Sequence, residues 1–171
     1  LLGLVLLNGL FAMSEIALVT AKKARLIKLS AEGDQGASVA LKLGEDPTTF
    51  LSTIQIGITS IGILNGIVGE AVLAAPLSQW LQSYGLATST ANITATAVIV
   101  VIVTYVSIVV GELVPKRIGQ ITPEPIARLV ARPMQLLALV TRPFVLLLTL
   151  STHGLLRILG VKQSSQSRVT E

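Results

Sequence analysis

The chain has 171 residues, of which 51% are hydrophobic and 13% are charged, and its formal net charge is +4 at pH 7. Soluble domains carry about a quarter charged residues, so this composition predicts a protein surrounded by lipid rather than water. The absence of Cys and the single His, His153, exclude disulfides, thiolate metal sites and histidine-based metal clusters. With so few aromatic residues and so modest a charge, a nucleic-acid partner is not expected.

Three apolar segments are long enough, or nearly so, to cross a hydrocarbon core, which takes about 20 residues of α-helix. We place these spans at about residues 1–21, 50–75 and 91–112. The third is rich in β-branched residues, which favour strands in water. A backbone inside lipid has to satisfy its own hydrogen bonds, however, and helix is then expected. The predicted fold class is an all-α membrane protein.

The segment between the first two spans is basic and amphipathic. The connection between the second and third spans, in contrast, contains no Lys or Arg. The positive-inside rule therefore places the first connection in the cytoplasm and the N-terminus outside. Apolar residues in this segment are spaced for short cytoplasmic helices, broken near Gly33 and Gly36. We expect a multi-pass protein of the cell (inner) membrane whose C-terminus is cytoplasmic.

A fourth apolar run lies within residues 122–159. Its length would allow it to span, but Arg142 and Pro143 interrupt its middle. A central Arg costs about 2.5–3.5 kcal/mol on insertion scales, and a proline removes a helical hydrogen bond and kinks the chain. We therefore favour three spans followed by a kinked juxtamembrane belt helix lying in the interface, with a fourth span as the alternative. Residues 1–160 then form the transmembrane domain and 161–171 a polar linker.

Polar side chains interrupt the first two spans. Ser14 can bond its own helix backbone, while Glu15 either lies near the interface or faces a partner, because carboxylates inside spans are rare. Asn65 lies well inside the second span, where an amide is costly unless both of its ends are used. It is either a packing contact between helices or an ion ligand. Gly62, Gly66 and Gly69 form a small-residue face suited to helix packing, including dimerisation.

The third span ends in the motif "GELVPK", residues 111–116. Pro115 has no N–H, so the carbonyl of Gly111 loses its α-helical hydrogen bond and is expected to be free. The carboxylate of Glu112 follows at the next position. This places a neutral and an anionic oxygen at a broken helix end, an arrangement that transporters use to hold cations. The alternative is a helix end kinked by proline, with Glu112 paired to Lys116.

The candidate ligands are all oxygen atoms, from Ser14, Asn65, Gly111 and Glu112. Such a set suits a hard cation such as Mg²⁺, Ca²⁺ or Na⁺. Ser14 and Glu112 both lie toward the cytoplasmic ends of their spans. Asn65 lies nearer the outer half by counting, so a shared site requires a tilted helix.

Three motifs in this order, "FAMSEIALVTAKKARLIKLSAEGDQGA", "DPTTFLSTIQIGIT" and "GELVPKRIG", resemble the transmembrane domain of the CorB/CorC and cyclin M (CNNM) magnesium transporters. The resemblance covers most of the chain. It implies a dimer with three spans, short cytoplasmic helices and a belt helix. It also implies that ATP binds only through a pair of cytoplasmic CBS modules that follow this domain and are absent from this chain.

The resemblance further implies export of Mg²⁺, coupled to Na⁺ entry. It assigns Mg²⁺ ligation to Ser14, Asn65, Gly111 and Glu112, with Pro115, Lys116 and Glu15 in support. Many relatives carry Asn after "QIG", where this chain has Ile58, so a ligand at that position is absent and Asn65 is the better candidate.

The leading interpretation is thus a dimeric Mg²⁺ transporter embedded in the bilayer. The alternative is a membrane anchor that senses Mg²⁺ for the cytoplasmic modules without transporting it. No nucleophile and base are placed on one face, so no enzyme activity is expected.

Overall fold

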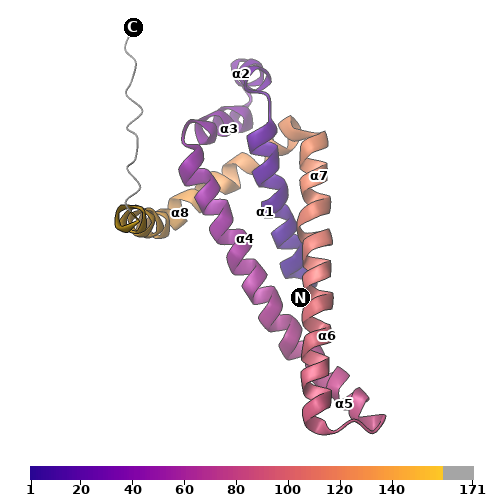
Figure 1. The fold of residues 1–171 in the computed structure, drawn as a ribbon. Helices are drawn as coiled ribbons and strands as arrows, with labels where there is room; N and C mark the ends of the chain where they lie inside the picture. The colour runs from indigo at the N-terminus through magenta and orange to yellow at the C-terminus, as the bar shows by residue number, and fades with distance from the viewer. Residues whose placement is uncertain (160–171) are drawn as a thin grey trace.

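The computed structural model describes residues 1–159, and the regular elements among them are helices (Figure 1). The predicted linker at 161–171 lies outside the described residues. The elements in chain order are α1 (Leu2–Thr20), α2 (Lys23–Ala31), α3 (Gln35–Glu45), α4 (Pro47–Gly69), the π-helical η1 (Glu70–Ala74), α5 (Ala75–Ser83), α6 (Thr88–Ile108), the π-helical η2 (Val109–Leu113), α7 (Val114–Ile121) and α8 (Pro123–Ile158). The predicted all-α class is confirmed.

Four helical stretches, rather than the three we expected, are long and apolar enough to cross a membrane. They are Leu2–Thr20, Pro47–Ser83, Thr88–Ile121 and Pro123–Ile158. The fourth qualifies because Pro133 and Pro143 do not end α8. Each proline removes a hydrogen bond but leaves the flanking turns intact, and the helix bends instead of stopping. The protein is a multi-pass membrane protein.

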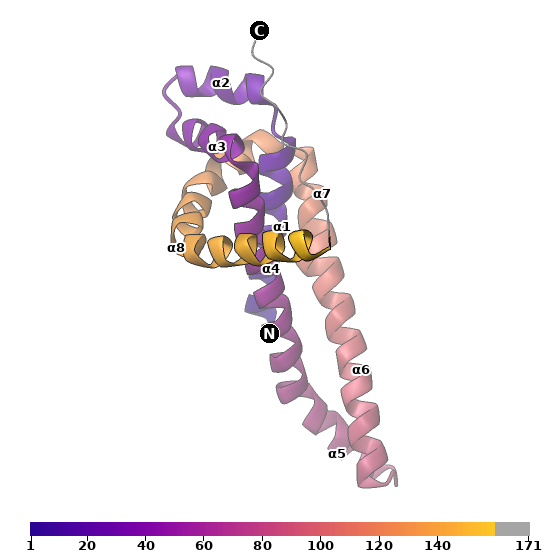
Figure 2. The same ribbon diagram turned by 60° about the vertical axis from the view of Figure 1, so that its left-hand side comes forward.

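The path of α8 distinguishes it from the other long helices. The helices α1 and α4 run side by side, and α1 also packs against α7, α8 and η2 (Figure 1). The helix α6 contacts α4 and lies mainly beyond the N-terminal end of α1 (Figure 1). The helix α8 curves, and its second half lies across α4 rather than along it (Figures 1 and 2). By length and composition α8 could span, but within this fold it wraps around the bundle.

The turn between α2 and α3 and the start of α4 have identifiable signals. Gly33, between α2 and α3, has a φ of +93°, which side chains other than glycine rarely adopt. Asp34 caps α3 by accepting a hydrogen bond from the Ala37 amide, and Asp46 caps α4 in the same way through Thr49. The expected break at Gly33 is therefore confirmed. The expected break at Gly36 is wrong, because Gly36 lies inside α3.

Gly36 is instead a contact point between α3 and α8. A Cβ atom placed there would lie 2.5 Å from the backbone oxygen of Arg128, so the two helices approach closely only because the side chain is missing. Next to this contact, the carboxylate of Asp34 pairs with Arg128. The Ala37 amide hydrogen bond, together with the Arg128 charge, holds the pKa of Asp34 below its usual value. The α2–α3 pair is thus fastened to the first turns of α8.

We expect Gly36→Ala to destabilise the fold by about 1–3 kcal/mol, because a backbone oxygen rather than a flexible side chain blocks the added methyl group. Gly44→Ala is the matched control, since Gly44 lies in the same helix and no atom lies within 4 Å of the position that a Cβ atom would take there. That control is expected to stabilise α3 by about 0.5–1 kcal/mol through helix propensity alone. Thermal unfolding of both variants in detergent checks the difference, and equal melting temperatures would contradict the contact.

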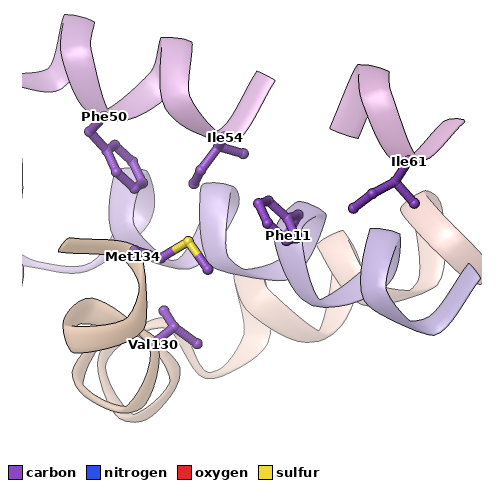
Figure 3. Close-up of a cluster of buried hydrophobic side chains, with 6 residues drawn as sticks. All are labelled: Phe11, Phe50, Ile54, Ile61, Val130 and Met134. Carbon is purple, nitrogen blue, oxygen red and sulfur yellow. The ribbon is translucent and has the colours of Figure 1, made fainter. Parts of the chain in front are cut away.

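The main buried cluster joins α1, α4 and α8. Its members are Phe11 from α1, Phe50, Ile54 and Ile61 from α4, and Val130 and Met134 from α8 (Figure 3). Gly57 of α4 faces the same cluster, where a Cβ atom would lie 2.4 Å from the Phe11 ring. This cluster fixes α1 against α4 and α8, and so positions the polar residues that follow Phe11.

Candidate cation site

The break at the end of the third span takes the form of a π-helical turn. The helix α6 continues into η2 at Val109, and Pro115 lies in the first turn of α7. The carbonyl of Gly111 accepts a hydrogen bond of 2.9 Å from the side-chain amide of Asn8 in α1. The expected free carbonyl is therefore not free. The amide of a neighbouring helix replaces the donor that Pro115 lacks.

Glycines allow α1 to approach this turn. A Cβ atom at Gly111 would lie 3.2 Å from the backbone oxygen of Val5, and one at Gly9 would lie 2.9 Å from the ring of Pro115. Either added methyl group would push the two helices apart. Gly9 and Gly111 thus allow the bond from Asn8 to the Gly111 carbonyl to form.

Asn8 also provides an oxygen that nothing in the described residues uses. Its side chain is only 5% exposed, its nitrogen is committed to Gly111, and its Oδ1 atom is buried without a hydrogen-bond partner. A buried, unpartnered amide oxygen costs about 1–3 kcal/mol, which a fold tolerates at sites that bind something. Sequence reasoning missed Asn8 as a site residue. The signal was available, because the argument that singled out Asn65 applies equally to an amide inside the first span.

Asn8 lines a cavity of about 230 Å³ between α1, α4 and α6. Its other polar walls are Thr104 and Ser107 of α6 and the carboxylate of Glu112, and Gly62 and Gly66 of α4 close it on one side. The cavity therefore combines one carboxylate with neutral oxygen atoms, and exposes backbone where the glycines lie.

Asn65 connects to this cavity through Ser107. It is 1% exposed and donates a hydrogen bond of 3.2 Å to the Ser107 hydroxyl, while its own Oδ1 is buried without a partner among the described residues. Asn65 is not itself a wall of the cavity. Its role as a ligand stays a prediction, as does the role of every predicted site residue.

Ser14 lies apart from this arrangement. It is fully buried, and its hydroxyl donates a 2.6 Å hydrogen bond to the Leu10 carbonyl of its own helix. The sequence allowed this contact, a hydrogen bond from Ser14 to the backbone of its own helix, as one of two roles for Ser14. The structure thus connects Gly111 to α1 through Asn8 rather than through Ser14.

Lys116 bridges two carboxylates. Its ammonium lies 2.9 Å from Glu112 in the expected pair one turn away, and 3.3 Å from Glu15 of α1. Glu15 also lines a second cavity, of about 640 Å³, whose other polar walls come mainly from α4. The three charges tie α1 to the start of α7 beside the cavity.

The predicted glycine face of α4 divides into two parts. Gly69 packs against Val103 of α6, where a Cβ atom would lie 2.8 Å from a side-chain carbon. Gly62 and Gly66 have no atom within 4 Å of a Cβ position and are exposed. Of these three glycines, only Gly69 therefore serves packing between the described helices of this chain.

The atoms at the cavity fit a hard cation that keeps part of its hydration. Amide, hydroxyl and carbonyl oxygens with one carboxylate are the donors that Mg²⁺ and Ca²⁺ prefer. Within residues 1–159, no three His, Cys, Asp or Glu side chains cluster in a way that could hold a metal ion. Any ion here would therefore depend mainly on neutral oxygens.

The family model described as the cyclin M transmembrane N-terminal domain matches residues 1–171. The chain belongs to the cyclin M family. This confirms the resemblance drawn from the three motifs, the first of which contains Ser14 and the third Gly111.

Relatives of this cyclin M domain include proteins named for different roles. A UPF0053 protein of Synechocystis is 48% identical over 168 residues, covering 98% of this chain and 38% of the relative. A UPF0053 protein of Bacillus subtilis is 32% identical over 163 residues, covering 95% of this chain and 35% of the relative. The polyamine export protein of Escherichia coli is 38% identical over 74 residues, covering 43% of this chain and 17% of the relative. The chain spans well under half the length of these relatives.

Proposed function

We propose that this domain transports a divalent cation, and Mg²⁺ in particular, across the cell membrane. The proposal is carried by two buried amide oxygens, of Asn8 and Asn65, that have no hydrogen-bond partner among residues 1–159. Asn8 lines the 230 Å³ cavity together with Ser107 and Glu112, and Asn65 donates a hydrogen bond to Ser107. Carboxylate and neutral oxygen donors are typical ligands of a hard cation. Export driven by Na⁺ entry is the direction that the family resemblance implies.

The name of the Escherichia coli relative raises polyamines as the other cargo. A polyamine carries several ammonium groups along an alkyl chain, and each favours a carboxylate. Among the polar walls of the 230 Å³ cavity only Glu112 is acidic, and it already pairs with Lys116. We therefore favour a compact ion over an extended organic cation at this site.

The contacts of α8 support its proposed placement as a belt helix. Thr141 bonds Thr53 of α4 at 3.2 Å, and Thr152, three turns later, still lines a cavity with Ser52 and Gln55. A helix running along α4 would have advanced about 16 Å over those 11 residues. Arg142, which argued against a span, lines a cavity with Asp46 at the start of α4. We propose that α8 lies in the cytoplasmic interface, with three spans crossing the bilayer and the N-terminus outside.

Dimerisation is proposed to use the exposed glycines of α4. Gly62 and Gly66 are one turn apart, with no neighbour within the described part of this chain. Small residues at this spacing let two membrane helices approach closely. The same face forms one wall of the cavity, so a second copy placed there would complete its enclosure.

Reconstitution into liposomes tests the function. The purified protein is expected to move Mg²⁺ down its gradient, detected by an enclosed Mg²⁺ indicator, and to respond to an opposing Na⁺ gradient. The same vesicles loaded with radiolabelled spermidine measure the competing cargo. Spermidine flux without Mg²⁺ flux would overturn the proposal. Mg²⁺ binding without flux of either cargo would favour the sensor that the sequence left as its alternative.

A further inference from the structure

Lys116 lies between two carboxylates that face different cavities. Glu112 lines the 230 Å³ cavity beside Asn8, and Glu15 lines the 640 Å³ cavity beside Gln55. Neither carboxylate belongs to the walls of the other's cavity. The Lys116 ammonium contacts both, at 2.9 Å and 3.3 Å. The Lys116 ammonium thus neutralises Glu112 in the candidate ion site and also Glu15 outside that site.

We infer that Lys116 is a tethered competitor of the transported cation, which holds Glu112 while the site is empty and shifts onto Glu15 when a cation binds. This inference rests on the proposed function, because it takes Glu112 as the group that receives the cation. It assigns Glu15 a positioning role, as the acceptor for the displaced ammonium.

The need for such a shift follows from charge. A divalent cation at Glu112 would lie within a few ångströms of the Lys116 ammonium, and like charges at that distance in a partly buried site repel strongly. Lys carries its charge on a flexible four-carbon stem, so its ammonium can move without moving the helix. An ammonium driven from Glu112 with no second partner would become a partly buried, unpaired charge, which is costly. Glu15 avoids that cost.

The arrangement also explains why one lysine has two partners. A helix end stabilised only by the pair one turn apart would need Glu112 alone. Glu15 adds a partner from another helix, and its side chain is the more enclosed of the two carboxylates, at 22% exposed against 38% for Glu112. The more accessible carboxylate, Glu112, lines the candidate ion site, and the more enclosed one, Glu15, would retain the ammonium.

The test is Mg²⁺ binding to the intact protein in lipid nanodiscs, measured by isothermal titration for wild type, Lys116→Gln, Glu15→Gln and the double variant. Lys116→Gln, which removes the competing ammonium, is expected to tighten Mg²⁺ binding by about tenfold, within the range typical of coupling between two ligands. Glu15→Gln, which removes the second partner of Lys116, is expected to weaken Mg²⁺ binding by about the same factor, because the ammonium then stays on Glu112. In the double variant, Glu15→Gln should no longer weaken Mg²⁺ binding, so the affinity should equal that of Lys116→Gln alone.

This pattern separates the inference from its alternatives. If Glu15 is itself a ligand, Glu15→Gln will weaken binding equally with or without Lys116, and the inference is overturned. If Lys116 is only structural, Lys116→Gln will lower the melting temperature and weaken binding, which also overturns it. Lys116→Arg keeps the charge and should leave the affinity near that of wild type. Wild-type protein that binds no Mg²⁺ would refute the proposed function itself, whereas binding that is lost in Glu112→Gln but not tightened in Lys116→Gln would refute this inference alone.

Discussion

Glu112→Gln is expected to weaken Mg²⁺ binding by roughly a hundredfold, equivalent to about 2.8 kcal/mol, and to abolish Mg²⁺ flux in liposomes. The reason is that Glu112 is the only carboxylate among the polar walls of the 230 Å³ cavity. The remaining donors there are neutral, and the affinity of oxygen sites for hard cations follows the number of charged ligands. The substitution keeps the shape of the side chain, so the loss reports the charge.

Glu70→Gln is the matched control for this prediction. Glu70 is an exposed carboxylate in the other π-helical segment, η1, at the far end of α4 from Asp46. It lies within a candidate span yet is not a wall of the small cavity. We expect its removal to leave Mg²⁺ affinity within twofold of wild type, a difference of about 0.4 kcal/mol. Flux that survives in Glu112→Gln, or is lost equally in Glu70→Gln, would contradict the assigned site.

Asn8→Leu is expected to destabilise the protein by about 1–3 kcal/mol and also to weaken Mg²⁺ binding. Leucine has the same branched shape as asparagine but leaves the buried Gly111 carbonyl without the donor that Pro115 cannot supply. It also removes the unpartnered Oδ1 atom from the cavity. Denaturant unfolding in detergent measures the first effect, and isothermal titration with Mg²⁺ measures the second.

Asn65→Leu provides the comparison. Asn65 donates to a hydroxyl, which can rotate to the carbonyl of its own helix once the amide is gone, so less stability should be lost than at Asn8. Both variants are expected to bind Mg²⁺ more weakly. If Asn8→Leu unfolds at the wild-type denaturant concentration, the bond to Gly111 does not have the structural role given to it here.

Three of the four candidate spans could be predicted from the sequence because hydropathy reports directly on the surrounding lipid. The special position of Gly111 was predictable for a similar reason, since the missing N–H of Pro115 is a covalent fact. The identity of its new partner was not predictable. That the Asn8 amide meets the Gly111 carbonyl depends on how closely α1 packs on η2, which Gly9 and Gly111 allow jointly from distant parts of the chain.

Other differences have the same origin. Ser14 was chosen for its place in a motif, and its hydroxyl donates to the Leu10 carbonyl of its own helix, the alternative that the sequence also allowed. Gly36 was read as a helix breaker, although its value lies in a contact with α8 that no local pattern encodes. The length and hydropathy of α8 permit a span, and only its contacts with α4 show that it crosses the bundle.

The π-helical turn at 109–113 has a geometric consequence for Glu112. A wider turn accommodates an additional residue, and successive residues of an α-helix are about 100° apart around the axis. If the additional residue moved by one turn along the helix, the side chains it passed would change their azimuth by about that angle, while the combined length of α6, η2 and α7 stayed the same. A shift past Glu112 would then turn its carboxylate to another side of the helix by a local twist.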